Sequence, residues 1–152
     1  MTAQIRPPEE GDFAAILSLQ SRTLNLTRTA DELTRELAGE HVICRVLKSR
    51  SDVLGFLNAW VVGETVELTE IAVDPECRNL GYGRALLRWL IDFALGRGCS
   101  RVILEVRAGN VPARGLYESF GFQVDGTRPR YYGNDEDAFL YSLEISSDPA
   151  SS

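Results

Sequence analysis

A glycine- and arginine-rich stretch that leads directly into helical periodicity is the most constraining feature of the sequence. Residues 74–87 are DPECRNLGYGRALL, with Gly81 and Gly83 two positions apart and Arg78 and Arg84 on either side of them. Glycines ahead of a helix let the backbone approach a ligand closely, and the first helical turn carries unpaired N–H groups and about half a positive charge. This combination favours an anion site, where the two arginines would add countercharge to a diphosphate.

The stretch differs from the common nucleotide-binding motifs. It lacks the GK[ST] sequence that a Walker loop contains, and it has no third glycine at the spacing of a dinucleotide-binding fingerprint. A tight turn between a strand and a helix also uses glycines, so the R-x-x-G-x-G pattern alone leaves a phosphate site and a purely structural turn open. A phosphate bound here would belong to another phosphorylated cofactor.

Hydrophobic periodicity places the stretch within a chain of mixed α/β order. Thr29 followed by Glu32 is a capping box that opens a helix, and Gly39 closes it. Three strands between residues 41 and 73 are separated by short turns, so we expect them to pair antiparallel in sequence order. The predicted strands are residues 3–6, 41–47, 53–62, 65–73, 101–107, 122–130 and 138–145, and the predicted helices are 12–20, 29–37, 83–98 and 111–121.

Length and composition indicate one compact domain. The 152 residues are 44% hydrophobic and 25% charged, which fits a single domain over residues 1–146 followed by a frayed tail at 147–152. The longest apolar stretch, VLGFLNAWVV, is shorter than the roughly 20 residues of a membrane span. Residues 1–12 lack the basic and apolar regions of a signal peptide, so we expect a cytoplasmic protein that does not bind membranes.

Charge and cysteine content exclude several classes of protein. The net charge of −6 argues against a general nucleic-acid binder, because such proteins neutralise phosphates with basic residues. An acidic surface weakly favours a cationic partner, such as an amine or a basic peptide. Cys44, Cys77 and Cys99 are odd in number and lack CxxC spacing, so the sequence predicts neither a disulfide framework nor a zinc site.

Two segments together resemble the GNAT superfamily of acetyl-CoA-dependent N-acetyltransferases. They are IAVDPECRNLGYGRALL at 71–87 and LEVRAGNVPARGLYESFGF at 104–122, and the likeness extends over most of the chain. The second segment and RYYGNDEDAFLYSL at 130–143 resemble the RimI-type branch, which acetylates protein N-termini, notably the alanine of a ribosomal protein. The resemblance implies a GNAT fold with a mixed, mostly antiparallel sheet of about seven strands flanked by about four helices. It also implies acetyl-CoA as cosubstrate and no metal.

The resemblance implies how acetyl-CoA is held. In the family, the strand matching residues 71–73 hydrogen-bonds the pantetheine arm like an extra strand, and the loop matching residues 79–84 holds the pyrophosphate. Asn110 matches a position that contacts the cofactor, but its place before a helix also makes it a natural N-cap, and both roles stay open. The implied cofactor-binding residues are Ile71, Ala72, Val73, Arg78, Asn79, Leu80, Gly81, Tyr82, Gly83, Arg84 and Asn110.

The resemblance also assigns two proton transfers. Attack on acetyl-CoA needs a neutral amine, so a base removes a proton, and an acid assists the departing CoA thiolate. Glu105 matches the family's proton acceptor, acting through water, and Tyr117 matches its proton donor. From the residues alone, Glu105 alternates with apolar neighbours and suits either a cleft or a solvated strand, while Tyr117 also suits core packing.

Other residues are candidates for the base and for the peptide site. Glu67 matches a glutamate that some histone-modifying relatives carry, and it is the alternative base. Glu70 is a second alternative base, a residue that shapes the peptide site, or a solvated side chain. Tyr131 and Tyr132 either line a groove for the first substrate residues or lie on the surface and core of a hairpin.

The acceptor amine bears on the function. Reference pKa values of about 7.8 for an α-amine and about 10.4 for lysine leave about 14% and about 0.04% neutral at pH 7. A glutamate acting through water therefore needs to remove a proton from a smaller fraction of the amine when the acceptor is an N-terminal α-amine. We expect a monomeric enzyme that acetylates the N-terminal α-amine of a protein, notably a ribosomal protein with N-terminal alanine, without binding nucleic acid directly. The alternatives are acetylation of a lysine or small amine, or a non-catalytic module that senses acetyl-CoA.

Overall fold

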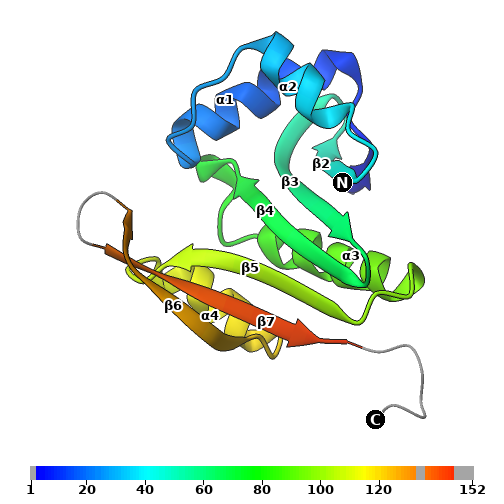
Figure 1. The fold of residues 1–152 in the computed structure, drawn as a ribbon. Helices are drawn as coiled ribbons and strands as arrows, with labels where there is room; N and C mark the ends of the chain where they lie inside the picture. The colour runs from blue at the N-terminus through cyan, green and yellow to red at the C-terminus, as the bar shows by residue number, and fades with distance from the viewer. Residues whose placement is uncertain (1–2, 133–135, 146–152) are drawn as a thin grey trace. The chain divides into compact units, whose positions relative to one another are not determined.

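The structure, a computed structural model, describes residues 3–132 and 136–145. Side chains at 130–132 lie outside that description, although their backbone belongs to a strand. In the described part, the strands form a seven-stranded sheet in the order β1-β2-β3-β4-β5-β7-β6 (Figure 1). The chain folds as two compact units, Met1–Val61 with Thr69–Leu90, and Val62–Leu68 with Ile91–Ser152, so β4 and α3 each contribute to both.

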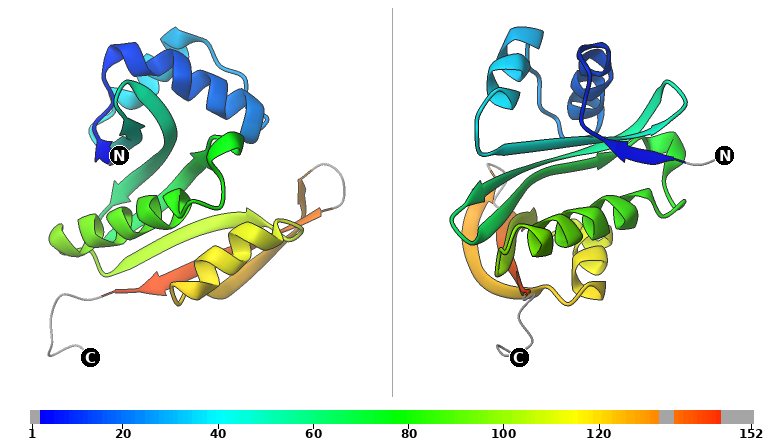
Figure 2. Two further views of the ribbon diagram at one scale, coloured as in Figure 1. Left: turned by 180° about the vertical axis from the view of Figure 1, so that it is seen from behind. Right: turned by 90° about the vertical axis from the view of Figure 1, so that its right-hand side faces the viewer.

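The first unit is built on antiparallel strands. β1 (Gln4–Arg6) pairs with β2 (Val42–Ser49), and β2 pairs with β3 (Asp52–Val62). α1 (Phe13–Thr23) and α2 (Ala30–Leu37) lie on one face of these strands (Figure 2). Their apolar sides bury a core with the strands, which comprises Ile16, Leu19, Leu33, Cys44, Val46, Phe56 and Ala72.

The capping box at the start of α2 is confirmed. The Thr29 hydroxyl accepts a hydrogen bond from the Glu32 backbone N–H at 3.1 Å, and the Thr29 N–H donates to the Glu32 carboxylate at 3.0 Å. Two of the helix's N–H groups are thereby satisfied, which fixes where the helix begins.

α3 (Tyr82–Gly96) follows the glycine-rich stretch and has the buried face that its periodicity predicts. The residues of this face are Leu86, Leu87, Leu90, Ile91 and Ala94. The helix ends where Gly98 adopts a φ of +78° and its N–H donates to the Leu95 carbonyl at 3.1 Å. Glycine takes this left-handed conformation without steric cost, so it closes the helix cleanly.

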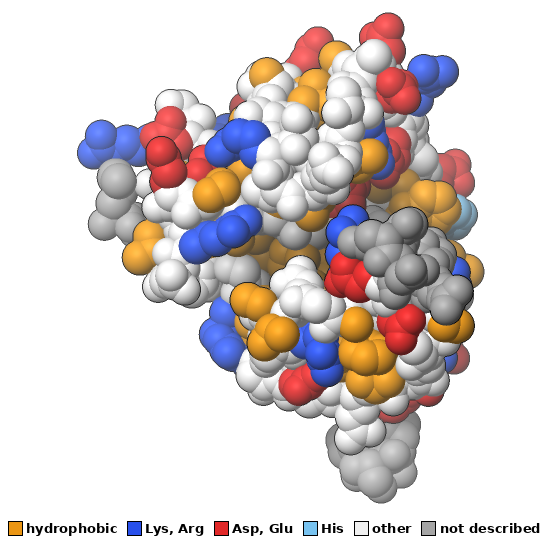
Figure 3. Space-filling model, turned by 90° about the vertical axis from the view of Figure 1, so that its left-hand side faces the viewer, with side chains coloured by type: hydrophobic (Ala, Val, Ile, Leu, Met, Phe, Trp, Pro, Cys, Tyr) orange, Lys and Arg blue, Asp and Glu red, His pale blue; other side chains and the backbone are white. Residues whose placement is uncertain are grey.

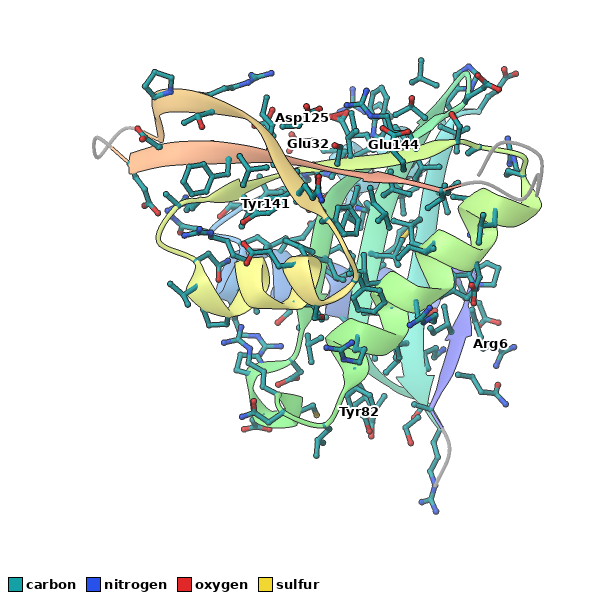
Figure 4. The ribbon with its side chains drawn as sticks, turned by 90° about the horizontal axis from the view of Figure 1, so that it is seen from below. Arg6, Glu32, Tyr82, Asp125, Tyr141 and Glu144 are labelled. Atoms are coloured by element: carbon teal, nitrogen blue, oxygen red, sulfur yellow. The ribbon has the colours of Figure 1, made fainter. Side chains whose placement is uncertain are left out.

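The second unit is organised around β5 (Arg101–Arg107). β5 pairs in parallel with Thr65–Leu68 of β4 (Thr65–Val73) and antiparallel with β7 (Glu136–Glu144), which pairs antiparallel with β6 (Gln123–Tyr132). α4 (Val111–Ser119) packs against one face of these strands (Figure 4). The register of these strands determines which of their side chains face α4 and can contact it.

The predicted fold class is confirmed, since the described residues form a mixed seven-stranded sheet with four α-helices. None of the described helices is long and apolar enough to cross a bilayer. Within the described ranges, Cys44, Cys77 and Cys99 are free, and no group of three His, Cys, Asp or Glu residues is placed to hold a metal. The tail at 147–152 lies outside the described residues, and the single domain and the cytoplasmic location stay predictions.

Candidate active site

The loop before α3 exposes its backbone. Asn79 and Gly81 have positive φ angles of 65° and 83°, and residues 78–81 are all exposed. The Gly81 carbonyl accepts the first helical hydrogen bond, from Ala85 N–H at 3.0 Å. By α-helical geometry, the backbone N–H groups of Tyr82 and its neighbours in the first turn then have no partner within the helix. The helix begins with a positive end that faces a glycine-rich loop.

This loop suits a diphosphate. A Cβ built on Gly81 meets no atom within 4 Å, so the chain leaves open space beside the backbone. Arg78, three residues before Gly81, is exposed and carries a fixed positive charge. Backbone donors, a helix N-terminus and a guanidinium together form a donor set for phosphate oxygens.

The predicted pantetheine strand lies in the later part of β4. The parallel ladder with β5 runs from Thr65 to Leu68, and Ile71, Ala72 and Val73 follow it along the strand. Ala72 is buried in the core of the first unit, whereas Ile71 and Val73 alternate with it and are half-buried. Whether this backbone binds pantetheine stays a prediction.

Glu105 lies on the face of β5 opposite to α4. Strand alternation turns it away from Leu104 and Val106, which are both buried. Its side chain is 27% exposed and forms an ion pair with Arg128 of β6 at 3.2 Å. No sequence pattern marks Arg128 as a partner of Glu105, because the pairing depends on strand register and not on spacing along the chain.

Tyr117 lies on α4 and faces the sheet. It is 6% exposed, and its ring is tilted against Phe122 and Tyr141 at centroid distances of 5.9 and 6.2 Å. Burial raises the pKa of the phenol to about 12, since the charged phenolate loses its solvation there. The side chain is therefore protonated at neutral pH.

Glu105 and Tyr117 approach from opposite faces of β5 and β7. Glu105 is registered with Leu140, whereas Leu104 is registered with Tyr141, whose hydroxyl contacts α4. Side chains on adjacent positions of a strand point to opposite faces. The two candidate catalytic groups are thus separated by the sheet within the second unit.

Glu67 shares a face with Glu105. Glu67 is registered with Ile103 in the parallel ladder, and Ile103 and Glu105 are two positions apart on β5. Glu67 is half-buried. Register alone does not discriminate between the two carboxylates as bases.

The Glu70 side chain is largely buried in the first unit, where it accepts several polar contacts, and it is therefore not a solvated side chain. Its carboxylate accepts hydrogen bonds from the amides of Gln20 at 2.9 Å and Asn58 at 2.8 Å. Arg28 lies 3.8 Å from the same carboxylate and also pairs with Glu36. Because the Glu70 side chain is only 10% exposed, these partners compensate the cost of burying its charge.

Asn110 caps α4. Its side-chain oxygen accepts a hydrogen bond from the Ala113 N–H at 3.3 Å, and a proline follows in the first turn, as predicted. The capping role is therefore present, and a contact with the cofactor stays a prediction. Tyr131 and Tyr132 are at the end of β6, and their side chains lie outside the described residues.

Side chains of both charges lie on one face of the protein (Figure 3). On the face drawn in Figure 3, acidic and basic side chains of the described residues are interspersed.

The raised pKa of Tyr117 predicts a loss of stability in alkali. A tyrosine in the unfolded chain has a pKa of about 10, so the folded state holds this proton more tightly. The contribution is fully present below about pH 10 and is lost as the pH rises towards 12. We expect the free energy of unfolding, measured by urea titration from pH 9 to 11, to fall less steeply in Tyr117→Phe.

Cys44 sets the baseline for that comparison. Its pKa is also raised to about 12 by burial, so the variant retains part of the slope, beginning near pH 9. Identical slopes in the wild type and Tyr117→Phe would contradict the assignment of a raised pKa to Tyr117.

Comparison with known proteins identifies the family. A sequence model of the acetyltransferase (GNAT) family matches residues 13–122. The ribosomal protein bS18-alanine N-acetyltransferase of Escherichia coli (strain K12) is 40% identical over 111 residues, which are 71% of this chain and 75% of that protein. The N-alpha-acetyltransferase RimI of Mycobacterium tuberculosis is 42% identical over 102 residues, 64% of this chain and 63% of that protein.

A solved structure agrees with the sequence relatives. The crystal structure of the ribosomal-protein-S18-alanine N-acetyltransferase from Escherichia coli matches with a TM-score of 0.87 and 33% identity, covering 97% of this chain and 96% of that one. The family match spans both the loop before α3 and the residues of β5 and α4. As the sequence predicted, the chain belongs to the acetyltransferase (GNAT) family.

Proposed function

We propose that this protein transfers the acetyl group of acetyl-CoA to the N-terminal α-amine of a protein. The substrate that we propose is a ribosomal protein with an N-terminal alanine. The observation that carries this proposal is the likeness, in sequence and over 97% of the chain in structure, to an Escherichia coli enzyme named for that reaction. Such a substrate would be met in the cytoplasm, by an enzyme acting as a monomer.

Acetyl-CoA is bound by the later part of β4 and by the loop before α3. The backbone of Ile71, Ala72 and Val73 would bind the pantetheine arm, and the exposed loop with Arg78 and the start of α3 would bind the pyrophosphate. The open space beside Gly81 and the positive φ angles of the loop support this assignment, because both bring bare backbone towards a ligand.

The two proton transfers involve side chains of β5 and α4. Glu105 accepts a proton from the attacking amine through water, and its orientation is set by Arg128. Tyr117 donates towards the CoA thiolate, and its protonated state at neutral pH supports that role.

The proposed contacts with the peptide begin at the end of β6. Tyr131 and Tyr132 would contact the first residues of the substrate, and Glu70 would shape the site through the helices and strands that its hydrogen bonds join. A lysine side chain, a small amine or a purely sensory role are the alternatives, and each predicts a different outcome in the experiments below.

Gly81→Val should strongly weaken acetyl-CoA binding. A branched side chain disfavours the φ of +83° and fills the space beside the loop. Gly98→Val is the matched control, because Gly98 has a φ of +78° and open space but lies at the other end of α3. Calorimetry should show a raised Kd only for Gly81→Val, and equal affinities in both variants would contradict the loop assignment.

Glu105→Gln should lower kcat about 10²- to 10⁴-fold while leaving acetyl-CoA affinity nearly unchanged, because only proton transfer is lost. Arg128→Gln breaks the same ion pair and keeps the carboxylate, so it should lower kcat less than Glu105→Gln does. Steady-state kinetics of Glu67→Gln decide between the two bases. Should Glu67→Gln be the crippling change while Glu105→Gln remains active, Glu67 is the base.

Peptides beginning with alanine and carrying a free N-terminus should be acetylated faster than the same peptides blocked at the N-terminus and carrying lysine. The physical reason is the several-hundredfold larger neutral fraction of an α-amine at pH 7, roughly 3.5 kcal/mol. Mass spectrometry locates the acetyl group on each peptide.

Replacement of Tyr131 and Tyr132 by alanine tests the peptide site in the same assay. The peptide KM should rise through the loss of contacts worth about 1–3 kcal/mol, with acetyl-CoA affinity retained. Faster acetylation of blocked lysine peptides would point to a lysine acetyltransferase. Binding of acetyl-CoA without CoA release from any amine would point to a sensor.

A further inference from the structure

A buried hydroxyl group joins α4 to the sheet. Tyr141 of β7 is 1% exposed, and its hydroxyl donates a hydrogen bond to the Glu118 carboxylate at 2.6 Å. The same oxygen accepts a hydrogen bond from the Arg114 Nε–H at 3.1 Å. Figure 4 shows Tyr141 between the sheet and the helix that carries both partners.

Arg114 extends this contact to the start of the helix. Its Nη1 donates to the carbonyl of Ala108 at 2.9 Å, in the loop between β5 and α4. Its guanidinium also lies 4.6 Å from the ring centroid of Phe139 on β7. The backbone N–H of Gly109 donates to the Glu136 carboxylate at 3.0 Å, so the loop is held to β7 independently.

The contact fixes how α4 is rotated about its axis. Arg114 and Glu118 are four residues apart and therefore lie one turn apart on the same face of the helix. Because the Tyr141 hydroxyl forms hydrogen bonds with both side chains, it opposes rotation of the helix about its axis as well as sliding along it. Tyr117 is adjacent to Glu118, and its ring contacts the Tyr141 ring at 6.2 Å between centroids.

We propose that Tyr141, acting with Arg114 and Glu118, is a positioning residue that sets the direction of the Tyr117 phenol. This inference rests on the proposed function, in which Tyr117 is the proton donor to the CoA thiolate. α4 has only nine residues, so its own helical stability is marginal and its orientation depends on tertiary contacts. A misplacement of about 1 Å at a reacting group can cost on the order of 10²-fold in rate.

The test is a double-mutant cycle in kcat with Tyr141→Phe and Tyr117→Phe. Tyr141→Phe keeps the ring and removes only the hydroxyl, so the protein should fold, as thermal melting would verify. We expect it to lower kcat on the order of 10- to 100-fold, with the peptide KM and the acetyl-CoA Kd within about twofold of wild type. In the Tyr117→Phe background it should have no further effect, because the phenol that it positions is gone.

Two further variants separate positioning from general loosening of the fold. Arg114→Met keeps an aliphatic stem against Phe139 and removes both donors, so it should reproduce the loss of kcat. Asp125→Asn removes an ion pair with Arg101 between β6 and β5 and should leave kcat unchanged (Figure 4).

The outcomes distinguish this inference from the proposed function. An unchanged kcat in Tyr117→Phe would refute Tyr117 as the donor and with it the positioning role. A lowered kcat in Tyr117→Phe together with an unchanged kcat in Tyr141→Phe would overturn the positioning role alone. Independent, multiplying effects in the double variant would also overturn it, because a merely structural role predicts them.

Discussion

The alternation of side chains along β5 is the constraint on which the second unit depends. Leu104 and Val106 are buried, so the strand must turn Glu105 to the other face, where Arg128 pairs with it. The register with β7 then places Tyr141 beside Leu104 and under α4. One strand thus presents a carboxylate on one face and a packing surface for a phenol on the other, without any irregularity of its backbone.

The first unit differs in that it buries a charged carboxylate beside its apolar core. Glu70 is held by amides from α1 and β3 and is faced by Arg28 of the segment between α1 and α2. Removing one partner would leave a buried carboxylate undercompensated, which is costly. The polar contacts therefore fix how both helices sit on the strands, whereas the apolar contacts alone would tolerate small shifts.

Local sequence patterns predicted the helices and strands. Contacts between side chains distant in the sequence depend on strand register, which these patterns do not give. The capping box at Thr29 and the apolar face of α3 depend on spacings of three or four residues, which the chain displays directly. The Glu70–Gln20 bond joins residues 50 positions apart, and the Tyr141–Arg114 bond joins residues 27 apart. Such pairs require the order and register of strands, so the sequence indicated Glu70 as a candidate but not its buried role.

The acidity of Tyr117 limits what the phenol can do and makes its direction matter. A pKa of about 12 lies well above that of an ordinary thiol, so complete proton transfer from the phenol to a thiolate is uphill. A hydrogen bond from the phenol to the developing negative charge stabilises the sulfur before the proton is transferred, which lowers the barrier to departure of the thiolate. Such a bond weakens steeply when its angle departs from linearity. A donor of this kind therefore contributes through its orientation more than through its acidity. The contact between Tyr141 and α4 controls that orientation.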